Sequence, residues 1–117
     1  MSTVTTSDLA AAHAVGSAQV VDVREPAEFV TGHVPGAASI PMGQLVDRLT
    51  ELDPTRPVFV VCQAGSRSSA MTDVLRHHGF DAHSVQGGTA AWIAGGHPVD
   101  PSTVDPSAVD PSTAEGK

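Results

Sequence analysis

Apolar and polar positions follow two periodicities along this chain. Short, mostly apolar runs are typical of strands that are buried on both faces of a sheet. Between these runs, apolar residues recur at helical spacing, and glycines or prolines mark the segment ends. Strands that alternate with helices in this way predict an α/β fold with a parallel sheet. The predicted strands cover residues 19–23, 38–40, 59–61 and 82–85.

The helical segments are marked by caps and by apolar faces. Thr5 and Asp8 stand in capping-box spacing at the start of the first helix. In the last helix, Trp92 and Ile93 are expected to pack on the sheet. The predicted helices run from Thr5 to Gly16, from Pro26 to Phe29, from about Met42 to Leu52, from Arg67 to Gly79 and from Thr89 to Ala94.

The third of these segments is predicted from its leucines. Leu45, Leu49 and Leu52 fall at helical spacing, with Val46 beside them. We therefore expect one continuous helix whose apolar face covers the sheet.

The only cysteine lies in the tight turn between the strand 59–61 and the helix that begins at Arg67. Such a turn directs several backbone N–H groups toward one point, and the positive end of the helix dipole adds to them. The first turn of this helix contains no acidic side chain, so a bound anion would complement the dipole. Gly65 lets the backbone adopt a positive φ. We expect this environment to lower the pKa of the Cys62 thiol.

Asp22 and Arg24 fall at the carboxyl end of another predicted strand, 19–23. Because parallel strands end at the same edge of a sheet, these side chains are expected near Cys62. Ligand sites of open α/β sheets lie along this edge.

Length and composition predict one globular domain, residues 1–98, followed by a tail, residues 99–117. The tail repeats Val-Asp-Pro-Ser three times at a period of five residues and is expected to be a disordered, acidic extension. The domain holds nine acidic and five basic groups, which gives −4, and the tail adds −3 to reach the total of −7. This acidic balance excludes nucleic acid as an expected partner.

Residue counts exclude several further classes of protein. One cysteine cannot form an internal disulfide, a CxxC pair or a cysteine-based zinc site. None of the six histidines has another at i+4, so no metal site is expected. Covalent chemistry at a cysteine would require no organic cofactor either. No apolar run approaches the roughly 20 residues of a membrane span, and the N-terminus has no basic region followed by an apolar run. These patterns predict a soluble, cytoplasmic protein without membrane contact.

Four segments occur in an informative combination. They are Asp22-Val23-Arg24-Glu25-Pro26 with Glu28-Phe29, Gly32-His33-Val34-Pro35-Gly36-Ala37 through Ile40-Pro41, Cys62 to Arg67 as C-x4-R, and Gly87-Gly88 with Trp92. In this order they resemble the recurring segments of the rhodanese sulfurtransferases, whose active-site loop is C-x4-R. The resemblance covers residues 4–98. A C-x4-R loop alone would be a weak signal, whereas four segments in order are specific.

The resemblance implies a rhodanese-like fold, with a central, mostly parallel five-stranded sheet flanked by helices on both faces. It also implies sulfurtransferase activity: the Cys62 thiolate takes the outer sulfur of thiosulfate or a persulfide and becomes a persulfide. That sulfur then passes to a thiophilic acceptor, either cyanide or a thiol. The implied partners are a small-molecule donor and acceptor and also a protein sulfur acceptor, and a monomer is expected. The groups that would stabilise the anionic sulfur are the backbone N–H groups of Gln63, Ala64, Gly65, Ser66 and Arg67.

The two arginines near the loop have different expected roles. Arg67 could hold an anionic donor, form an internal ion pair with Asp22 or Glu25, or do both. Arg24 is expected to be structural, with Glu28 as its partner.

Other side chains of the loop bear on the donor. Ser68 could donate a hydrogen bond to the terminal sulfur, and Ser66 could do the same or cap the helix. Gln63 stands where the best-known thiosulfate enzymes of the family often have a basic residue. Arg67 is then the only cation in the loop that would attract a dianion, so a persulfide would suit this site better than thiosulfate.

Two other functions compete with sulfur transfer. Phosphatases and arsenate reductases of related fold also place a cysteine in an anion-binding loop, but that loop is C-x5-R, one residue longer than the loop found here. The second rival is a non-catalytic module that binds a partner or relays sulfur within a larger pathway. Inactive relatives typically lose the cysteine, which this chain keeps.

Overall fold

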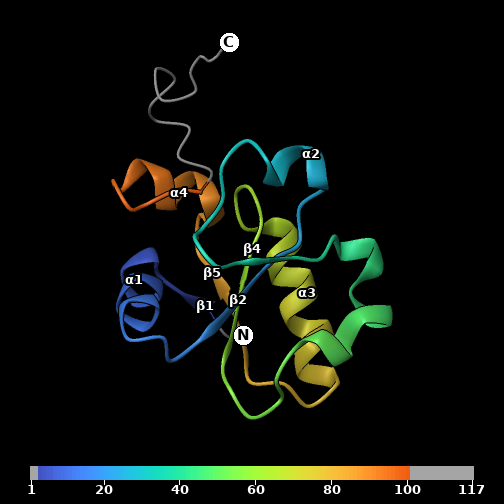
Figure 1. Ribbon diagram of the computed structural model, residues 1–117. Coiled ribbons are helices and arrows are strands. Elements are labelled where there is room, and N and C mark those ends of the chain that lie inside the picture. Colours follow the sequence, from blue (N-terminus) through green and yellow to red (C-terminus); the bar gives the residue numbers. More distant parts are fainter. Residues whose placement is uncertain (1–2, 101–117) are drawn as a thin grey trace.

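Residues 3–100 are the part of the chain that the structure, a computed structural model, describes. Its centre is a five-stranded sheet in the order β1-β5-β4-β2-β3, and every pair of neighbouring strands is parallel (Figure 1). This confirms the predicted α/β class and the central five-stranded parallel sheet. The strands are β1 (Thr3–Val4), β2 (Gln19–Asp22), β3 (Ala38–Ser39), β4 (Val58–Val61) and β5 (Ala82–Val85).

Helices cover both faces of the sheet. Helices α1 and α4 lie on one face, and α3 lies on the other together with two short 3-10 helices, η1 and η2 (Figure 1). No helix among residues 3–100 is long and apolar enough to cross a membrane. The helices are α1 (Thr6–Ala14), α2 (Pro26–Phe29), η1 (Met42–Gln44), η2 (Val46–Glu51), α3 (Ser66–His77) and α4 (Gly88–Ala94).

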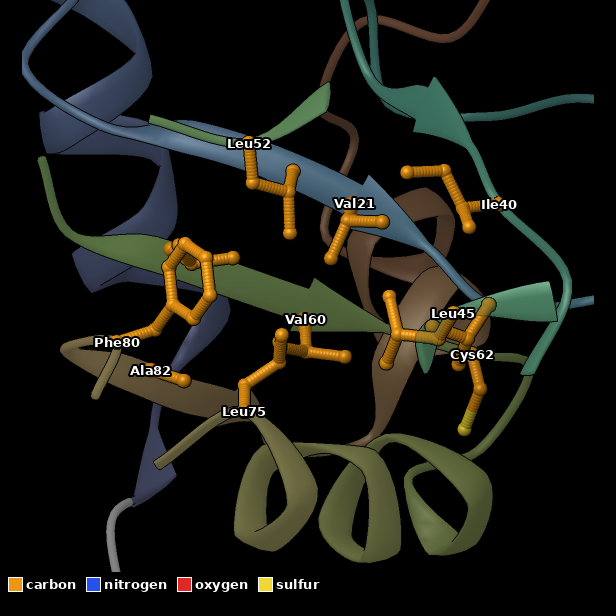
Figure 2. Close-up of a cluster of buried hydrophobic side chains, with 11 residues drawn as sticks. Val21, Ile40, Leu45, Leu52, Val60, Cys62, Leu75, Phe80 and Ala82 are labelled. Atoms are coloured by element: carbon orange, nitrogen blue, oxygen red, sulfur yellow. The ribbon is translucent and has the colours of Figure 1, made fainter. Parts of the chain in front are cut away.

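Strand β4 lies at the centre of the sheet, and all four of its residues are buried. Its side chains alternate between the two faces. Val60 and Cys62 belong to the cluster beneath α3, which also contains Leu75 (Figure 2). Phe59 and Val61 belong to the opposite cluster, with residues of α1 and α4. Burial on both faces therefore explains the continuous apolar run that predicted this strand.

The prediction of one helix over residues 42–52 was wrong. The chain forms η1 and η2 instead, and Arg48 has non-helical dihedral angles of φ −119° and ψ 20°. Leu45 and Leu52 are still buried, whereas Val46 is 56% exposed. The spacing of the leucines thus fixes which side chains face the sheet, but it does not select between α and 3-10 hydrogen bonding. Gly43 adds to this because glycine disfavours a regular helix.

Two details at the chain ends differ from the sequence analysis. Strand β1 was not located in advance, because two residues with one partly buried side chain, Val4, carry no periodic signal.

In α4, Trp92 packs against the sheet at 1% exposure as predicted, but Ile93 is 46% exposed. Consecutive helical residues point about 100° apart, so both cannot face the sheet.

The chain stays in contact with the domain as far as Asp100. Val99 packs against the cluster that contains Trp92, and Asp100 pairs with His33 through backbone hydrogen bonds. The rest of the predicted tail, residues 101–117, lies outside the described residues.

Candidate active site

Cys62 follows the last residue of β4, and three residues separate it from the first residue of α3. Gly65 is the N-cap of that helix and has φ 119°, a conformation that only glycine adopts without strain. This bend lets the Gly65 N–H donate to Cys62 Sγ at 3.0 Å. Ser66 is the first residue of α3 and is not its cap, so the capping role considered for it was wrong.

The N-terminus of α4 supports the loop from the opposite side. The Thr89 N–H donates to the Cys62 carbonyl at 2.8 Å, and the Ala90 N–H donates to the Gln63 carbonyl at 3.0 Å. This approach requires Gly88, because a Cβ there would overlap the Cys62 carbonyl oxygen. Gly88 also has φ 58°. The Gly-Gly segment is therefore needed for close packing of α4 against the loop.

A pair of buried hydroxyl groups lies behind the sulfur. Ser68 Oγ is 3.5 Å from Cys62 Sγ and 3.0 Å from the Gly65 carbonyl oxygen, to which it can donate. Ser84 Oγ, from β5, is 2.9 Å from Ser68 Oγ. Sequence reasoning did not find Ser84. The available signal was a serine next to Val85, near the carboxyl end of a predicted strand.

These contacts act on the pKa of Cys62 in opposite directions. Burial raises the pKa and is the largest single effect, but the hydrogen bonds together outweigh it, so that the pKa is lowered from its ordinary value. The donors are the hydroxyl and N–H groups of Ser68 and the N–H groups of Gly65 and Ala64. The site therefore favours a thiolate.

The thiol is also shielded from solvent. Cys62 is 1% exposed, and its neighbours in the cluster beneath α3 include Val23 and Leu45. Its sulfur is directed toward the amino-terminal part of α3 (Figure 2). Two cavities of about 310 and 430 Å³ occur elsewhere, one beside β2 and α1 and the other against Phe80. The sulfur therefore has polar contacts with Ser68 and Gly65, and the rest of the side chain packs within the aliphatic cluster beneath α3.

Arg24 forms a buried ion pair at the edge predicted for it. Its guanidinium bonds both oxygens of Asp22, with a shortest distance of 2.8 Å, and both residues are at most 1% exposed. It also donates to the Gly32 carbonyl at 2.8 Å and to Gln63 Oε1 at 3.1 Å. The predicted partner, Glu28, was wrong, because the carboxylate of Glu28 is held by another arginine.

That arginine is Arg67, whose two terminal nitrogens lie 2.7 and 2.8 Å from the two carboxylate oxygens of Glu28. The predicted partners of Arg67, Asp22 and Glu25, were therefore wrong. The hydrogen bonds from Arg67 and, next, from the Glu25 N–H lower the pKa of Glu28 to about 2. The bonds to Glu28 raise the pKa of Arg67, and the nearby Cys62 and Asp22 contribute to this.

Comparison with known proteins identifies this arrangement. A family model for the rhodanese-like domain matches residues 5–95. The chain belongs to the rhodanese-like domain family.

Individual proteins are similar to much of this chain. A protein of Bacillus subtilis named YqhL, which is described as uncharacterized, is 41% identical over 76 residues; these make up 64% of this chain and 60% of YqhL. A rhodanese-related protein of Thermoplasma volcanium has a similar structure, with a TM-score of 0.79, 30% identity and coverage of 85% of this chain and 97% of that one. A protein of Rhodopseudomonas palustris, described as a possible tyrosine phosphatase, gives a TM-score of 0.75 at 27% identity, with coverage of 86% and 85%.

The rhodanese-like fold brings the predicted site residues together. Of the loop N–H groups predicted to face the sulfur, that of Gly65 contacts Cys62 Sγ at 3.0 Å and that of Ala64 also acts on its pKa, whereas the side chains of Gln63 and Arg67 bond Arg24 and Glu28. Ser68 lies behind the sulfur. Their catalytic roles stay predictions. Across residues 3–100, no three His, Cys, Asp or Glu side chains gather into a group that could hold a metal ion.

Proposed function

We propose that this rhodanese-like domain is a sulfurtransferase that carries sulfane sulfur as a Cys62 persulfide. The donor is thiosulfate or a persulfide, and the acceptor is cyanide or a thiol, which a small molecule or a partner protein would supply. Membership of the family supports a sulfurtransferase-type activity or a related module. The observation that carries the finer proposal is the contact of Cys62 Sγ with the Gly65 N–H at 3.0 Å, in a site that lowers the pKa of the thiol.

The first half-reaction forms one bond and breaks one. The Cys62 thiolate attacks the outer sulfur of the donor, the new S–S bond forms, and the bond within the donor breaks. Its electron pair leaves on sulfite, when the donor is thiosulfate, or on a thiolate, when the donor is a persulfide. No separate oxidant or reductant is needed, because the transferred sulfur brings its own oxidation state.

The second half-reaction returns the enzyme to its starting state. Cyanide or a thiolate attacks the terminal sulfur, and Cys62 leaves as the thiolate. The products are thiocyanate or a new persulfide. The N–H groups around the loop would stabilise negative charge on sulfur in both halves, as donors in an oxyanion hole do. Because the thiol is 1% exposed, the donor reaches it only when covering side chains move.

Phosphate chemistry is a weaker candidate, although one relative is described as a possible tyrosine phosphatase. The loop from Cys62 to Arg67 has four intervening residues, which is one fewer than in loops that surround a tetrahedral oxyanion. In addition, the guanidinium that would bind phosphate is held by Glu28. Hydrolysis of an aryl phosphate that depends on Cys62 would move the assignment to this class.

The intact mass of the purified protein tests the proposal. After incubation with thiosulfate, or separately with a small persulfide, we expect the protein to gain one sulfur atom that cyanide removes. Cys62→Ser should gain none. A wild-type protein that never gains sulfur from either donor would leave the non-catalytic module as the better interpretation, and sulfur transfer by Cys62→Ser would exclude the mechanism.

A further inference from the structure

We propose that Glu28 sets the charge selectivity of the Cys62 site by neutralising Arg67, so that uncharged donors are favoured over dianions such as thiosulfate. The chemical class of donor that follows is a persulfide of a thiol with little negative charge. This deepens the proposed function and rests on it for the identity of the donor, but the charge selectivity itself concerns any reagent that approaches Cys62.

The first step in the argument is the geometry of the ion pair. Arg67 ends the loop that begins at Cys62, and both of its terminal nitrogens face the two oxygens of Glu28 at 2.7 and 2.8 Å. This bidentate arrangement uses the same two donors that would bind an anionic substrate. The side chains are 31% and 36% exposed, so an incoming anion could reach the pair but would have to compete with a carboxylate that is already bound.

The second step is that the other nearby cation is occupied as well. The guanidinium of Arg24 is bonded to Asp22, to the Gly32 carbonyl and to Gln63, and it is buried. The remaining arginines of residues 3–100 are bonded elsewhere. Arg48 bonds Glu51 and Gln44, Arg56 bonds the Gly16 carbonyl, and Arg76 bonds the Ala82 carbonyl.

The third step is the sum of charge at the site. With the thiolate, Asp22 and Glu28 counted as −1 each and the two arginines as +1 each, the cluster around Cys62 carries −1. It lies in a domain whose formal charge is also negative. A dianion therefore approaches against repulsion, whereas an uncharged reagent does not.

Glu28 also has a structural contact, and a suitable variant separates the two roles. Glu28 Oε1 accepts the Glu25 N–H at 3.0 Å as part of the cap of α2. Glutamine at this position keeps an acceptor oxygen for the cap but removes the charge. Glu28→Gln therefore removes the negative charge that neutralises Arg67, while the cap of α2 is kept.

The test compares two alkylating reagents that differ mainly in charge, the anion iodoacetate and the neutral iodoacetamide. The measured quantity is the ratio of their rate constants at Cys62, followed by intact mass at low ionic strength. We expect Glu28→Gln to raise the iodoacetate-to-iodoacetamide ratio by about 2- to 10-fold, as the removal of one nearby charge implies. The increase should shrink when salt screens the site.

Two further variants control the result. Glu51→Gln removes a carboxylate that is likewise bonded to an arginine, Arg48, so it makes the same change in total charge at another place and should leave the ratio unchanged. In the double variant Glu28→Gln, Arg67→Gln, the cluster returns to its original charge, and the ratio should return toward the wild-type value.

Sulfur transfer supplies the second readout. Glu28→Gln should also raise kcat/KM for thiosulfate. The logarithm of that factor should be about twice the logarithm of the factor by which the variant raises the iodoacetate rate constant, because a dianion interacts twice as strongly with a nearby charge. An alkylation ratio that Glu28→Gln leaves unchanged, or that Glu51→Gln raises equally, overturns the proposal, as does a Cys62 that neither reagent alkylates. If the wild-type protein transfers no sulfur from any donor, the proposed function fails, while the alkylation ratio still decides the role of Glu28.

Discussion

The hydroxyl oxygens of Ser68 and Ser84 lie 2.9 Å apart behind the sulfur of Cys62. Both residues are buried. Ser68 Oγ has two other partners, the Gly65 carbonyl and Cys62 Sγ. Ser84 Oγ, in contrast, has only Ser68 as a hydrogen-bond partner among residues 3–100. A buried hydroxyl needs an acceptor for its proton, so Ser84 donates to Ser68. The Ser68 proton is then free to bond the Gly65 carbonyl when Cys62 is a thiol and the sulfur when Cys62 is a thiolate.

This pair predicts that Ser84 affects the acidity of Cys62 without contacting it. Donation from Ser84 polarises the Ser68 O–H group and strengthens its bond to the thiolate. Ser84→Thr keeps the hydroxyl, and Ser84→Val has nearly the same shape without it. We expect the pKa of Cys62 to be higher in Ser84→Val than in Ser84→Thr, because the Ser68 hydroxyl bonds the thiolate less strongly when Ser84 no longer donates to it. The pH dependence of the iodoacetamide rate measures this difference, and superimposed profiles would refute the role of Ser84.

The bond between Glu28 and Arg67 predicts a pH-dependent contribution to stability. The pKa of Glu28 is lowered from 4.5 to about 2 in the folded protein, so the stabilisation is complete above pH 4.5 and is lost as the pH falls from 4.5 to 2. Because the pair is partly exposed and screened, we expect Glu28→Gln to lower the free energy of unfolding by only about 0.5–1 kcal/mol at pH 7. Urea unfolding at pH 7 and near pH 2 should show this difference and then its loss. A difference that stays constant over that range would contradict the linkage.

The buried pair of Arg24 and Asp22 predicts a larger effect. Replacement of Arg24 by methionine leaves the Asp22 carboxylate buried at 0% exposure without its cation. We expect the free energy of unfolding to fall by about 3–5 kcal/mol, as is usual when one partner of a buried pair is removed. Arg48→Met removes an exposed ion pair with Glu51 and should cost much less. Similar urea midpoints for these two variants would show that burial of the pair does not matter.

Gly88 and Gly16 allow backbone strain to be separated from steric contact. Both have positive φ, 58° and 65°, but a Cβ on Gly88 would overlap the Cys62 carbonyl, whereas one on Gly16 would meet nothing within 4 Å. Gly16→Ala should therefore cost about 1–2 kcal/mol from strain alone. Gly88→Ala should cost roughly 3 kcal/mol or more and should also disturb the reactivity of Cys62. Chemical denaturation compares the two, and equal costs would mean that α4 can move away from the loop.

Local patterns were sufficient to predict most of the fold. The apolar residues of β2 and β4 could be found because burial on both faces of the sheet leaves a continuous apolar run. The loop from Cys62 to Arg67 could be found because a strand end, a glycine and a helix start occur within a few residues. The partners of Arg24 and Arg67 could not, because the choice between Asp22, Glu25 and Glu28 depends on how α2 lies against the loop.

Other features lacked a distinguishing signal. The leucines over residues 42–52 face the sheet equally well from 3-10 turns, so their spacing could not exclude η1 and η2. Ser84 occupies a strand position that could hold any small residue, and its importance arises only from its contact with Ser68 on α3. The near-complete burial of Cys62 likewise depends on packing, since Leu45 comes from a distant segment.

The anchoring of the Cys62 and Gln63 carbonyls by α4 has a consequence for the opposite side of the loop. In a trans peptide the C=O and the following N–H point in opposite directions within one rigid plane. When α4 fixes these two carbonyls, it also fixes the N–H vectors of Gln63 and Ala64, which must turn away from α4. The orientation of these two N–H groups is thus determined by a helix that contributes no side chain to them, and a shift of α4 by a fraction of an ångström would rotate both dipoles together.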